Sequence, residues 1–254
     1  MSRLTTKGIV LQRRQYSDFD LIVTMLTADR GKRTLIAKSA KKSAKRFPGI
    51  LEPFNHLQIV FRETRRKGMP VLEEATLYRP FENLRSDFEK TAYASYWVES
   101  ISIWLEEGQV EPDVYRLLAF VLDALNAGKM EAAFLSILFQ MRFVGHEGLQ
   151  PVLERCTCCQ SPIEQLPQNS FCVDLGQGGV VCNHCPTGTH KHLRLSKGTL
   201  KQLLWISTGD LTKASRMRFS SRAMAEATAF MEAFMPYHIG RKPKSLGILQ
   251  QVRA

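Results

Sequence analysis

Alternating apolar and polar positions run through the first eighty or so residues of the chain. Segments rich in β-branched residues, each typical of a short strand, cover residues 8–16, 20–28, 33–37, 56–61 and 70–78. Asp29 to Lys32 is a turn signal between the second and third of them. Five short strands with little helix predict a small closed barrel, for which the OB barrel is the common five-stranded solution. An SH3-like barrel fits the same pattern.

Helical spacing replaces this alternation after Pro80. Apolar stripes and end signals predict helices over residues 87–107 (capped by Ser86), about 112–126, 129–146, 196–208 and 220–235. We interpret Trp97 and Trp104 as core residues of this bundle and not as platforms for stacking bases. The tail from Tyr237 to Ser245 is basic, and we expect it to be extended around Pro243.

These patterns predict an α+β multidomain protein: an N-terminal five-stranded OB-type barrel, then a helical bundle with an inserted four-cysteine zinc segment. The expected domains are 1–80, an OB-fold nucleic-acid-binding domain; 81–150, the first part of the helical domain; 151–193, the zinc-binding segment; and 194–254, the second part of the helical domain with the basic tail.

The charge of the chain is concentrated in its N-terminal part. The whole chain of 254 residues carries +11, and residues 1–80 alone hold 17 Lys and Arg against 7 Asp and Glu, a balance of +10. The run from Lys38 to Arg46 has five positive charges in nine residues and no negative one. We expect it to be a solvated, mobile loop that contributes nothing to the core. A solubilising surface loop is the alternative, but the asymmetry favours contact with nucleic acid or an anionic membrane.

The start of the chain has no apolar stretch typical of a secretory signal, and no segment approaches the length of a transmembrane helix. We therefore expect a cytoplasmic protein with no membrane partner. In a reducing compartment, its six cysteines are expected to be metal ligands or buried thiols.

Two C-x-x-C pairs, Cys156 with Cys159 and Cys182 with Cys185, are separated by 22 residues that are rich in turn signals. Each pair can aim two sulfurs at one point, and four thiolates satisfy tetrahedral Zn²⁺. Such a closed site is structural and would replace the hydrophobic core that we expect this segment to lack. Unmetallated thiols are the alternative. Cys158 and Cys172 are surplus to the four ligands, and Cys158 could compete with its neighbours as a ligand. The alternative ligands of lower rank are His184, His190 and His192.

Catalytic motifs are lacking. The glycines from Gly176 to Gly179 are not followed by the lysine of a phosphate-binding loop, and neither H-E-x-x-H nor G-x-S-x-G occurs. Asp18, Asp20 and Asp29 are possible ligands for Mg²⁺ in a nuclease, although turn and solvation roles fit them better. We therefore predict a binding protein and not an enzyme.

Several stretches resemble the RecO family of bacterial recombination mediators. They are Tyr16-Ser17-Asp18 before Leu21-Ile22-Val23, then Leu26-Thr27 and Gly31-Lys32, the basic run leading into Leu51-Glu52-Pro53-Phe54, and the tail with Gly240-Arg-Lys-Pro243-Lys-Ser245. They occur in the right order over most of the chain. The resemblance implies an OB barrel followed by a helical domain, with a four-cysteine zinc site in some members. Cys158 departs from a plain C-x-x-C pair.

The resemblance also implies a role in DNA repair and recombination: loading recombinase onto gaps coated with single-strand-binding protein, together with RecR, and annealing complementary strands. The partners would be single- and double-stranded DNA, RecR and the acidic C-terminal tail of single-strand-binding protein, in the cytoplasm at the nucleoid. A metal-dependent nuclease and an RNA-binding zinc protein are the alternatives.

Basic residues of the barrel are the predicted phosphate contacts. They are Lys38, Lys41, Lys42, Lys45 and Arg46, extended by Arg13, Arg14, Arg65, Arg66 and Lys67. Aromatic residues are absent within the basic run, and Phe47 is the nearest one able to stack on a base. About five phosphate contacts on single strands predict a salt slope near −3.5, or ~100-fold weaker binding at 200 than at 50 mM salt.

Overall fold

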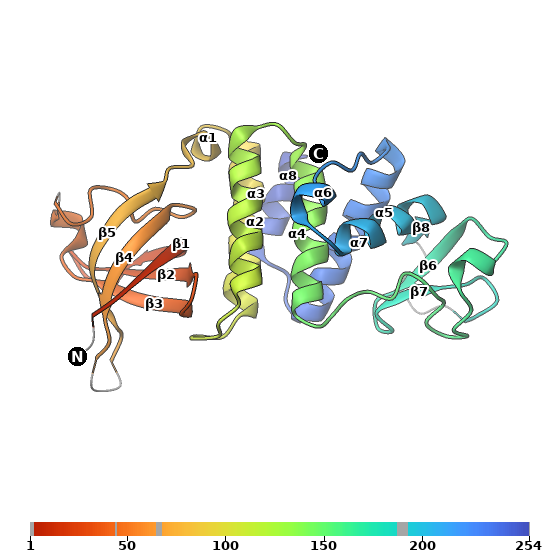
Figure 1. The fold of residues 1–254 in the computed structure, drawn as a ribbon, viewed down its shortest axis with the longest axis horizontal. Coiled ribbons are helices and arrows are strands. Elements are labelled where there is room, and N and C mark those ends of the chain that lie inside the picture. Colours follow the sequence, from red (N-terminus) through yellow and green to blue (C-terminus); the bar gives the residue numbers. More distant parts are fainter. Residues whose placement is uncertain (1–2, 44, 65–67, 187–192, 254) are drawn as a thin grey trace. The chain divides into compact units, whose positions relative to one another are not determined.

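The computed structural model describes residues 3–43, 45–64, 68–186 and 193–253 (Figure 1). The chain forms two compact units. The first unit contains residues 1–127 together with residues 243–254, and the second contains residues 128–242. Among the described residues, no helix combines the length and the apolar character needed to cross a membrane.

Five strands form the barrel of the first unit: β1 (Arg3–Gln15), β2 (Leu21–Thr27), β3 (Gly31–Ala37), β4 (His56–Arg62) and β5 (Val71–Arg79). Their order is β1-β2-β3-β5-β4. The long strand β1 pairs with β4 through its first half and with β2 through its second half, and the β1–β2 register shifts between Val10 and Gln12. A parallel seam of one residue pair, Ile36 with Val71, closes the barrel between β3 and β5. The predicted five-stranded OB-type barrel is confirmed.

Alternate residues of these strands fill the barrel. Its core of buried residues is Val10, Leu21, Val23, Met25, Leu35, Ala37, Ala40, Phe47, Leu51, Leu57, Ile59, Phe61, Leu72 and Ala75. Three of them, Ala40, Phe47 and Leu51, come from the connection between β3 and β4 and not from a strand. The alternation of the strands with period two predicted their contribution but not that of the connection.

The basic run contributes Ala40 to the core of the barrel, so the expectation that it contributes nothing there is wrong, whereas its charged residues are exposed as expected. Residues Ala40–Lys42 form the short 3₁₀ helix η1. Ala40 is buried, and so is Phe47, which is 3% exposed and therefore not available to stack on a base. Two apolar side chains are enough to fasten the segment to the barrel, while the charged residues between them stay outside.

Helices α1 (Glu82–Arg85), α2 (Phe88–Trp104) and α3 (Pro112–Ala127) follow the barrel. Asp87, and not Ser86 as predicted, caps α2, because its side chain accepts a hydrogen bond from the backbone N–H of Lys90. Trp97 is fully buried as predicted, whereas Trp104 is half-buried.

The tail differs from the extended segment expected around Pro243. Gly240, with φ of 70°, ends one helix, and α8 (Lys244–Val252) begins directly after Pro243 and packs on α2. The carboxylate of Glu99 on α2 accepts hydrogen bonds from the backbone N–H groups of Lys244 and Ser245, at 3.1 and 2.8 Å. These bonds satisfy two free N–H groups of the first turn, so α8 depends on a residue far earlier in the chain.

Four helices build most of the second unit: α4 (Ala132–His146), α5 (Lys197–Ser207), α6 (Leu211–Ala214) and α7 (Ser221–Ile239). Helices α4, α5 and α7 pack on one another. Arg142 on α4 is largely buried, and its guanidinium donates to the carbonyl oxygens of Ile206, Thr208 and Gly209 at the end of α5. The carbonyls of Ile206 and Thr208 are among those that a helix leaves without partners inside the helix, and Gly209 follows directly after them.

The cysteine segment lies between α4 and α5 and has a small core, contrary to expectation. It contains the 3₁₀ helix η2 (Ile163–Gln165) and a three-stranded sheet in the order β7 (Gly179–Val181), β6 (Ser170–Asp174) and β8 (Arg194–Ser196). Its buried residues include Phe171, Val173, Val180, Val181 and Leu195. This sheet was not predicted from the sequence, because its strands are only three to five residues long and lie among polar turns.

Candidate metal centre and nucleic-acid surface

Two tight turns carry the four cysteines. In the first, Cys156 donates its backbone N–H to the carbonyl of Ser161 at 2.9 Å and accepts a bond from the N–H of Gln160 at 3.0 Å. In the second, which follows β7 directly, the N–H of Cys185 donates to the carbonyl of Cys182 at 3.2 Å. The bond from the N–H of Thr157 to the carbonyl of Val180, 2.9 Å long, joins the first turn to β7, which directly precedes the second turn.

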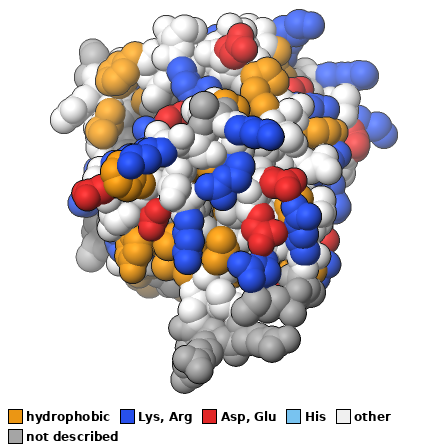
Figure 2. Space-filling model, turned by 90° about the vertical axis from the view of Figure 1, so that its left-hand side faces the viewer, with side chains coloured by type: hydrophobic (Ala, Val, Ile, Leu, Met, Phe, Trp, Pro, Cys, Tyr) orange, Lys and Arg blue, Asp and Glu red, His pale blue; other side chains and the backbone are white. Residues whose placement is uncertain are grey.

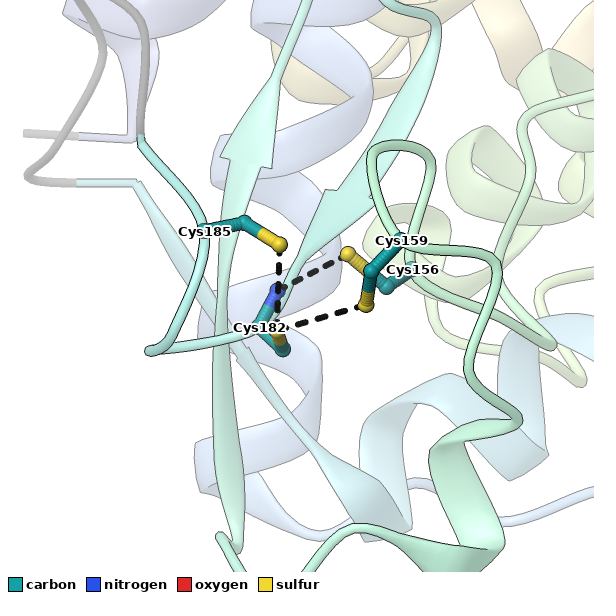
Figure 3. Close-up of side chains that lie close together, drawn as sticks. All are labelled: Cys156, Cys159, Cys182 and Cys185. Carbon is teal, nitrogen blue, oxygen red and sulfur yellow. Dashed lines mark hydrogen bonds between the residues drawn. The ribbon is translucent and has the colours of Figure 1, made fainter.

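The sulfurs of Cys156, Cys159, Cys182 and Cys185 all lie within 4.8 Å of one another and point toward a common centre (Figure 3). The sulfur of Cys182 is 3.8 Å from that of Cys159 and 3.6 Å from that of Cys185. A tetrahedral zinc ion with Zn–S bonds of ~2.3 Å separates its sulfur ligands by ~3.8 Å. The predicted residues are therefore close enough together to hold a metal ion, and two of the sulfur pairs have the separation of a tetrahedral zinc site.

Local hydrogen bonds also suit a thiolate cluster. The backbone N–H of Cys182 donates to the sulfur of Cys156 at 3.3 Å. Hydrogen bonding with Ser161 lowers the pKa of the Cys159 thiol to about 6, and the neighbouring Cys182 raises that of Cys185. Four sulfurs this close compete for protons, and a bound cation allows all of them to be thiolates.

The two surplus cysteines are not part of the four-sulfur cluster, although the Cys158 side chain interacts with that of Cys185 and helps to raise its pKa. Cys158 is exposed, and the buried Cys172 on β6 accepts a hydrogen bond from Arg194 at 2.9 Å. His184 lies between two of the ligand cysteines in sequence but does not belong to the cluster. The alternative ligands His190 and His192 lie outside the described residues.

The predicted phosphate contacts lie on the barrel. Lys38, Lys41, Lys42, Lys45 and Arg46, here called the basic loop, are all exposed, as are Arg13 and Arg14 at the end of β1. Arg13, Lys41 and Lys42 line a groove of about 420 Å³ whose apolar wall includes Phe47 and Leu51. Arg13 is also paired with Glu52 at 2.7 Å, and Arg14 does not line this groove. Arg65, Arg66 and Lys67 lie outside the described residues.

Backbone contacts hold the basic loop against the turn between β1 and β2. The Asp20 carboxylate accepts from the N–H of Ser39 at 2.7 Å, and the carbonyl of Phe19 accepts from the N–H of Lys41 at 3.1 Å. Arg46 donates to the carbonyl of Lys38 at 2.8 Å. The bonds of Asp20 and Phe19 join segments that are about twenty residues apart in the sequence, whereas that of Arg46 lies within the loop. The loop is therefore an ordered charged surface.

The three aspartates considered as nuclease ligands do not form a metal site. Asp20 binds the Ser39 backbone, whereas Asp29 bonds the Thr6 hydroxyl and pairs with Arg30. In the part of the chain that the structure describes, the cysteine set is the one group of three or more metal-binding side chains that meets at a point.

Exposed aromatic residues that were not predicted from the sequence lie beside the basic loop. Tyr16 is 62% exposed and Phe19 is 42% exposed, and both lie on the β1–β2 turn. The ammonium of Lys42 lies 3.4 Å from the centre of the Phe19 ring. The face of the barrel drawn in Figure 2 shows hydrophobic side chains interspersed with many Lys and Arg. The sequence does contain a signal for this surface, because two aromatic residues flank the polar residues Ser17 and Asp18.

Known proteins and family models match this chain along its whole length. A family model described as Recombination protein O N terminal matches residues 1–81, and one described as Recombination protein O C terminal matches residues 85–247. The chain is 41% identical over 254 residues to the DNA repair protein RecO of Desulfatibacillum aliphaticivorans, covering 100% of this chain and 98% of that protein. It is 41% identical to the RecO of Desulfosudis oleivorans, covering 100% and 99%. For the RecO of Anaeromyxobacter sp. (strain K), the identity is 33%, covering 99% and 98%.

Proposed function

The chain belongs to the RecO family of DNA repair proteins, and we propose that it is a DNA-binding recombination mediator without enzymatic turnover. It binds single- and double-stranded DNA, anneals complementary strands, and helps to load recombinase onto gaps coated with single-strand-binding protein. Its protein partners are RecR and the acidic tail of single-strand-binding protein, and it works in the cytoplasm at the nucleoid.

The unneutralised charge of the basic loop is the observation that carries this proposal. Among the described ion pairs, none includes Lys38, Lys41, Lys42, Lys45 or Arg46, whereas other arginines of the barrel are paired with glutamates, such as Arg3, Arg13, Arg33 and Arg62. Cations that are not paired with a carboxylate can replace the counterions of a phosphate backbone.

Annealing follows from the same surface. Two complementary strands repel each other through their phosphates, and this repulsion opposes their meeting. Cations held on an ordered loop lower the repulsion when they contact both strands. Base pairing then supplies the free energy, so no nucleotide hydrolysis is required.

The metal in this proposal is structural zinc. Four cysteine thiolates from the two turns would fill every position of a tetrahedral ion, which leaves no position for a substrate. The ion would join the turn of residues 156–159 to that of residues 182–185, where the three-stranded sheet is too short to supply a large core.

Strand annealing by the full chain tests the proposal. Complementary oligonucleotides labelled with a donor and an acceptor fluorophore report duplex formation without ATP or added metal. The variant Lys41→Gln/Lys42→Gln/Lys45→Gln should anneal more slowly, and we leave Arg46 intact because it bonds the loop backbone. The control variant Lys129→Gln/Lys201→Gln/Lys213→Gln removes the same charge from exposed positions of the second unit. Equal rates for the two variants would refute the assignment of the basic loop.

Two further measurements separate the alternatives. Shortened products after incubation of labelled DNA with Mg²⁺ or Mn²⁺ would identify a nuclease and reject a purely binding role. Tighter binding to structured RNA than to single-stranded DNA at one salt concentration would identify an RNA-binding protein instead.

A further inference from the structure

Two large aromatic side chains stand in solvent on one short turn. Residues 16–20, here called the aromatic turn, join β1 to β2 and carry Tyr16, 62% exposed, and Phe19, 42% exposed. Burying aromatic side chains of this size is a main source of stability. Leaving two of them on five residues forgoes that stability, so folding alone does not account for their position.

The aromatic turn is held in one conformation by its own backbone. The carbonyl of Asp20 accepts from the N–H groups of Tyr16, at 3.1 Å, and Ser17, at 3.5 Å, and the Ser17 hydroxyl accepts from the N–H of Asp20 at 3.1 Å. The bonds from Ser39 and Lys41 then fasten the turn to the basic loop. Binding at these rings therefore requires little further ordering of the backbone that carries them.

Lysine side chains of the basic loop lie beside the aromatic turn. The ammonium of Lys42 covers one face of the Phe19 ring at 3.4 Å, and Lys41 and Lys42 line the adjoining groove. Aromatic rings beside a positive groove are the arrangement with which proteins hold single-stranded nucleic acid, because every base has a face that can stack. The exposed carboxylate of Asp18, between the two rings in the sequence, repels phosphate and favours a strand whose bases face the turn.

We propose that Tyr16 and Phe19 stack on unpaired bases of a single DNA strand whose phosphates contact Lys41 and Lys42. This inference rests on the proposed DNA binding and adds to it a preference for bases that are not already paired. In a duplex, the faces of the bases are covered by their neighbours, so the aromatic turn contributes to binding single strands and little to binding duplexes.

The test compares strands that differ in their bases alone. Affinity of the full chain is measured by fluorescence anisotropy for a mixed-sequence single strand, for an abasic strand of equal length and charge, and for a duplex. Tyr16→Ala and Phe19→Ala should each weaken binding of the normal strand roughly tenfold. Binding of the abasic strand and the salt slope should not change, since no charge is removed.

Matched variants separate stacking from other contacts. Tyr16→Trp should keep wild-type affinity, whereas Tyr16→Leu, apolar but without a ring, should not. Phe88→Ala removes another exposed aromatic residue, 70% exposed on α2, and should have no effect. Lys41→Gln should weaken binding of all three DNAs and flatten the salt slope.

Each contrary outcome has its own meaning. Equal wild-type affinity for normal and abasic strands would overturn stacking and leave the basic-loop proposal standing, whereas wild-type protein that binds no DNA would overturn the proposed function itself. If Tyr16→Ala and Phe19→Ala bind every DNA like wild type but lose binding to single-strand-binding protein, the aromatic turn is a protein-docking surface and the stacking proposal is wrong.

Discussion

The salt dependence of DNA binding gives the sharpest test of the basic loop. Its five cations are exposed, and none takes part in a described ion pair. Each phosphate contact on a single strand contributes about −0.7 to the slope of log K against log salt, so five contacts give about −3.5. Between 50 and 200 mM salt, this slope corresponds to a loss of ~100-fold in affinity.

Substituting Lys41, Lys42 and Lys45 with glutamine should reduce the magnitude of this slope by about 2.1. With the remaining slope near −1.4, the loss of affinity over the same salt range becomes ~7-fold. Fluorescence anisotropy of a labelled single strand at four or more salt concentrations measures both slopes. The change in slope is the decisive quantity, because contacts made elsewhere on the chain add equally to both proteins.

Arg13 supplies an internal check on this reasoning. Its guanidinium lies 2.7 Å from the carboxylate of Glu52, and it must leave this partner to neutralise a phosphate. Arg13→Gln should therefore change the slope less than Lys41→Gln does, and Glu52→Gln should make the slope steeper. A triple lysine variant that binds more weakly but keeps the wild-type slope would refute phosphate contact by the basic loop.

Three other predictions concern the zinc site and stability. Purified protein should contain about one zinc ion per chain by mass spectrometry. Cys182→Ser should lose the ion and melt at a lower temperature, whereas the control Cys158→Ser should do neither. Wild-type protein without zinc would contradict the site. Arg142→Met removes the donor of the buried Ile206 carbonyl and of the Thr208 and Gly209 carbonyls. It should lower the free energy of unfolding in urea by about 1–3 kcal/mol, whereas Arg116→Met on the surface should change it little. Burial, followed by the charges of Arg79 and Lys7, lowers the pKa of His56 to about 4. The unfolded chain therefore takes up a proton first, and stability falls as the pH drops from about 6.5 toward 4, by on the order of 2–3 kcal/mol at pH 4.5. His56→Gln should lack this dependence, and an equal slope in both proteins would show that other groups cause it.

Local patterns predicted the barrel and the cysteine cluster well. The strands of the barrel alternate between core and solvent over several residues, and this alternation is visible without knowledge of their partners. The two C-x-x-C pairs also carry their information locally, because each forms one tight turn. The sequence did not show which strands pair. The structure shows that β1 pairs with both β2 and β4.

Features that depend on distant residues were not predictable. Helix α8 is short, and the two N–H groups at its start are satisfied by Glu99, which no pattern near Pro243 reveals. Ala40 and Phe47 are apolar residues next to a dense run of charge, and their burial depends on the barrel that receives them. The same holds for Phe19 and Lys42, which meet because the β1–β2 turn and the basic loop are hydrogen-bonded to each other.

The metal and the DNA-binding surface should be separable in function. All four cysteines, and the hydrogen bonds that join their turns, belong to the second unit, whereas the basic loop and the aromatic turn belong to the first unit. Removal of zinc should therefore loosen the cysteine segment and leave the barrel folded. We expect protein treated with a chelator to bind single-stranded DNA with the wild-type salt slope. If it then loses annealing or partner binding, the cysteine segment serves those steps; a flattened slope would show instead that this segment contributes phosphate contacts of its own, and that the barrel alone does not account for DNA binding.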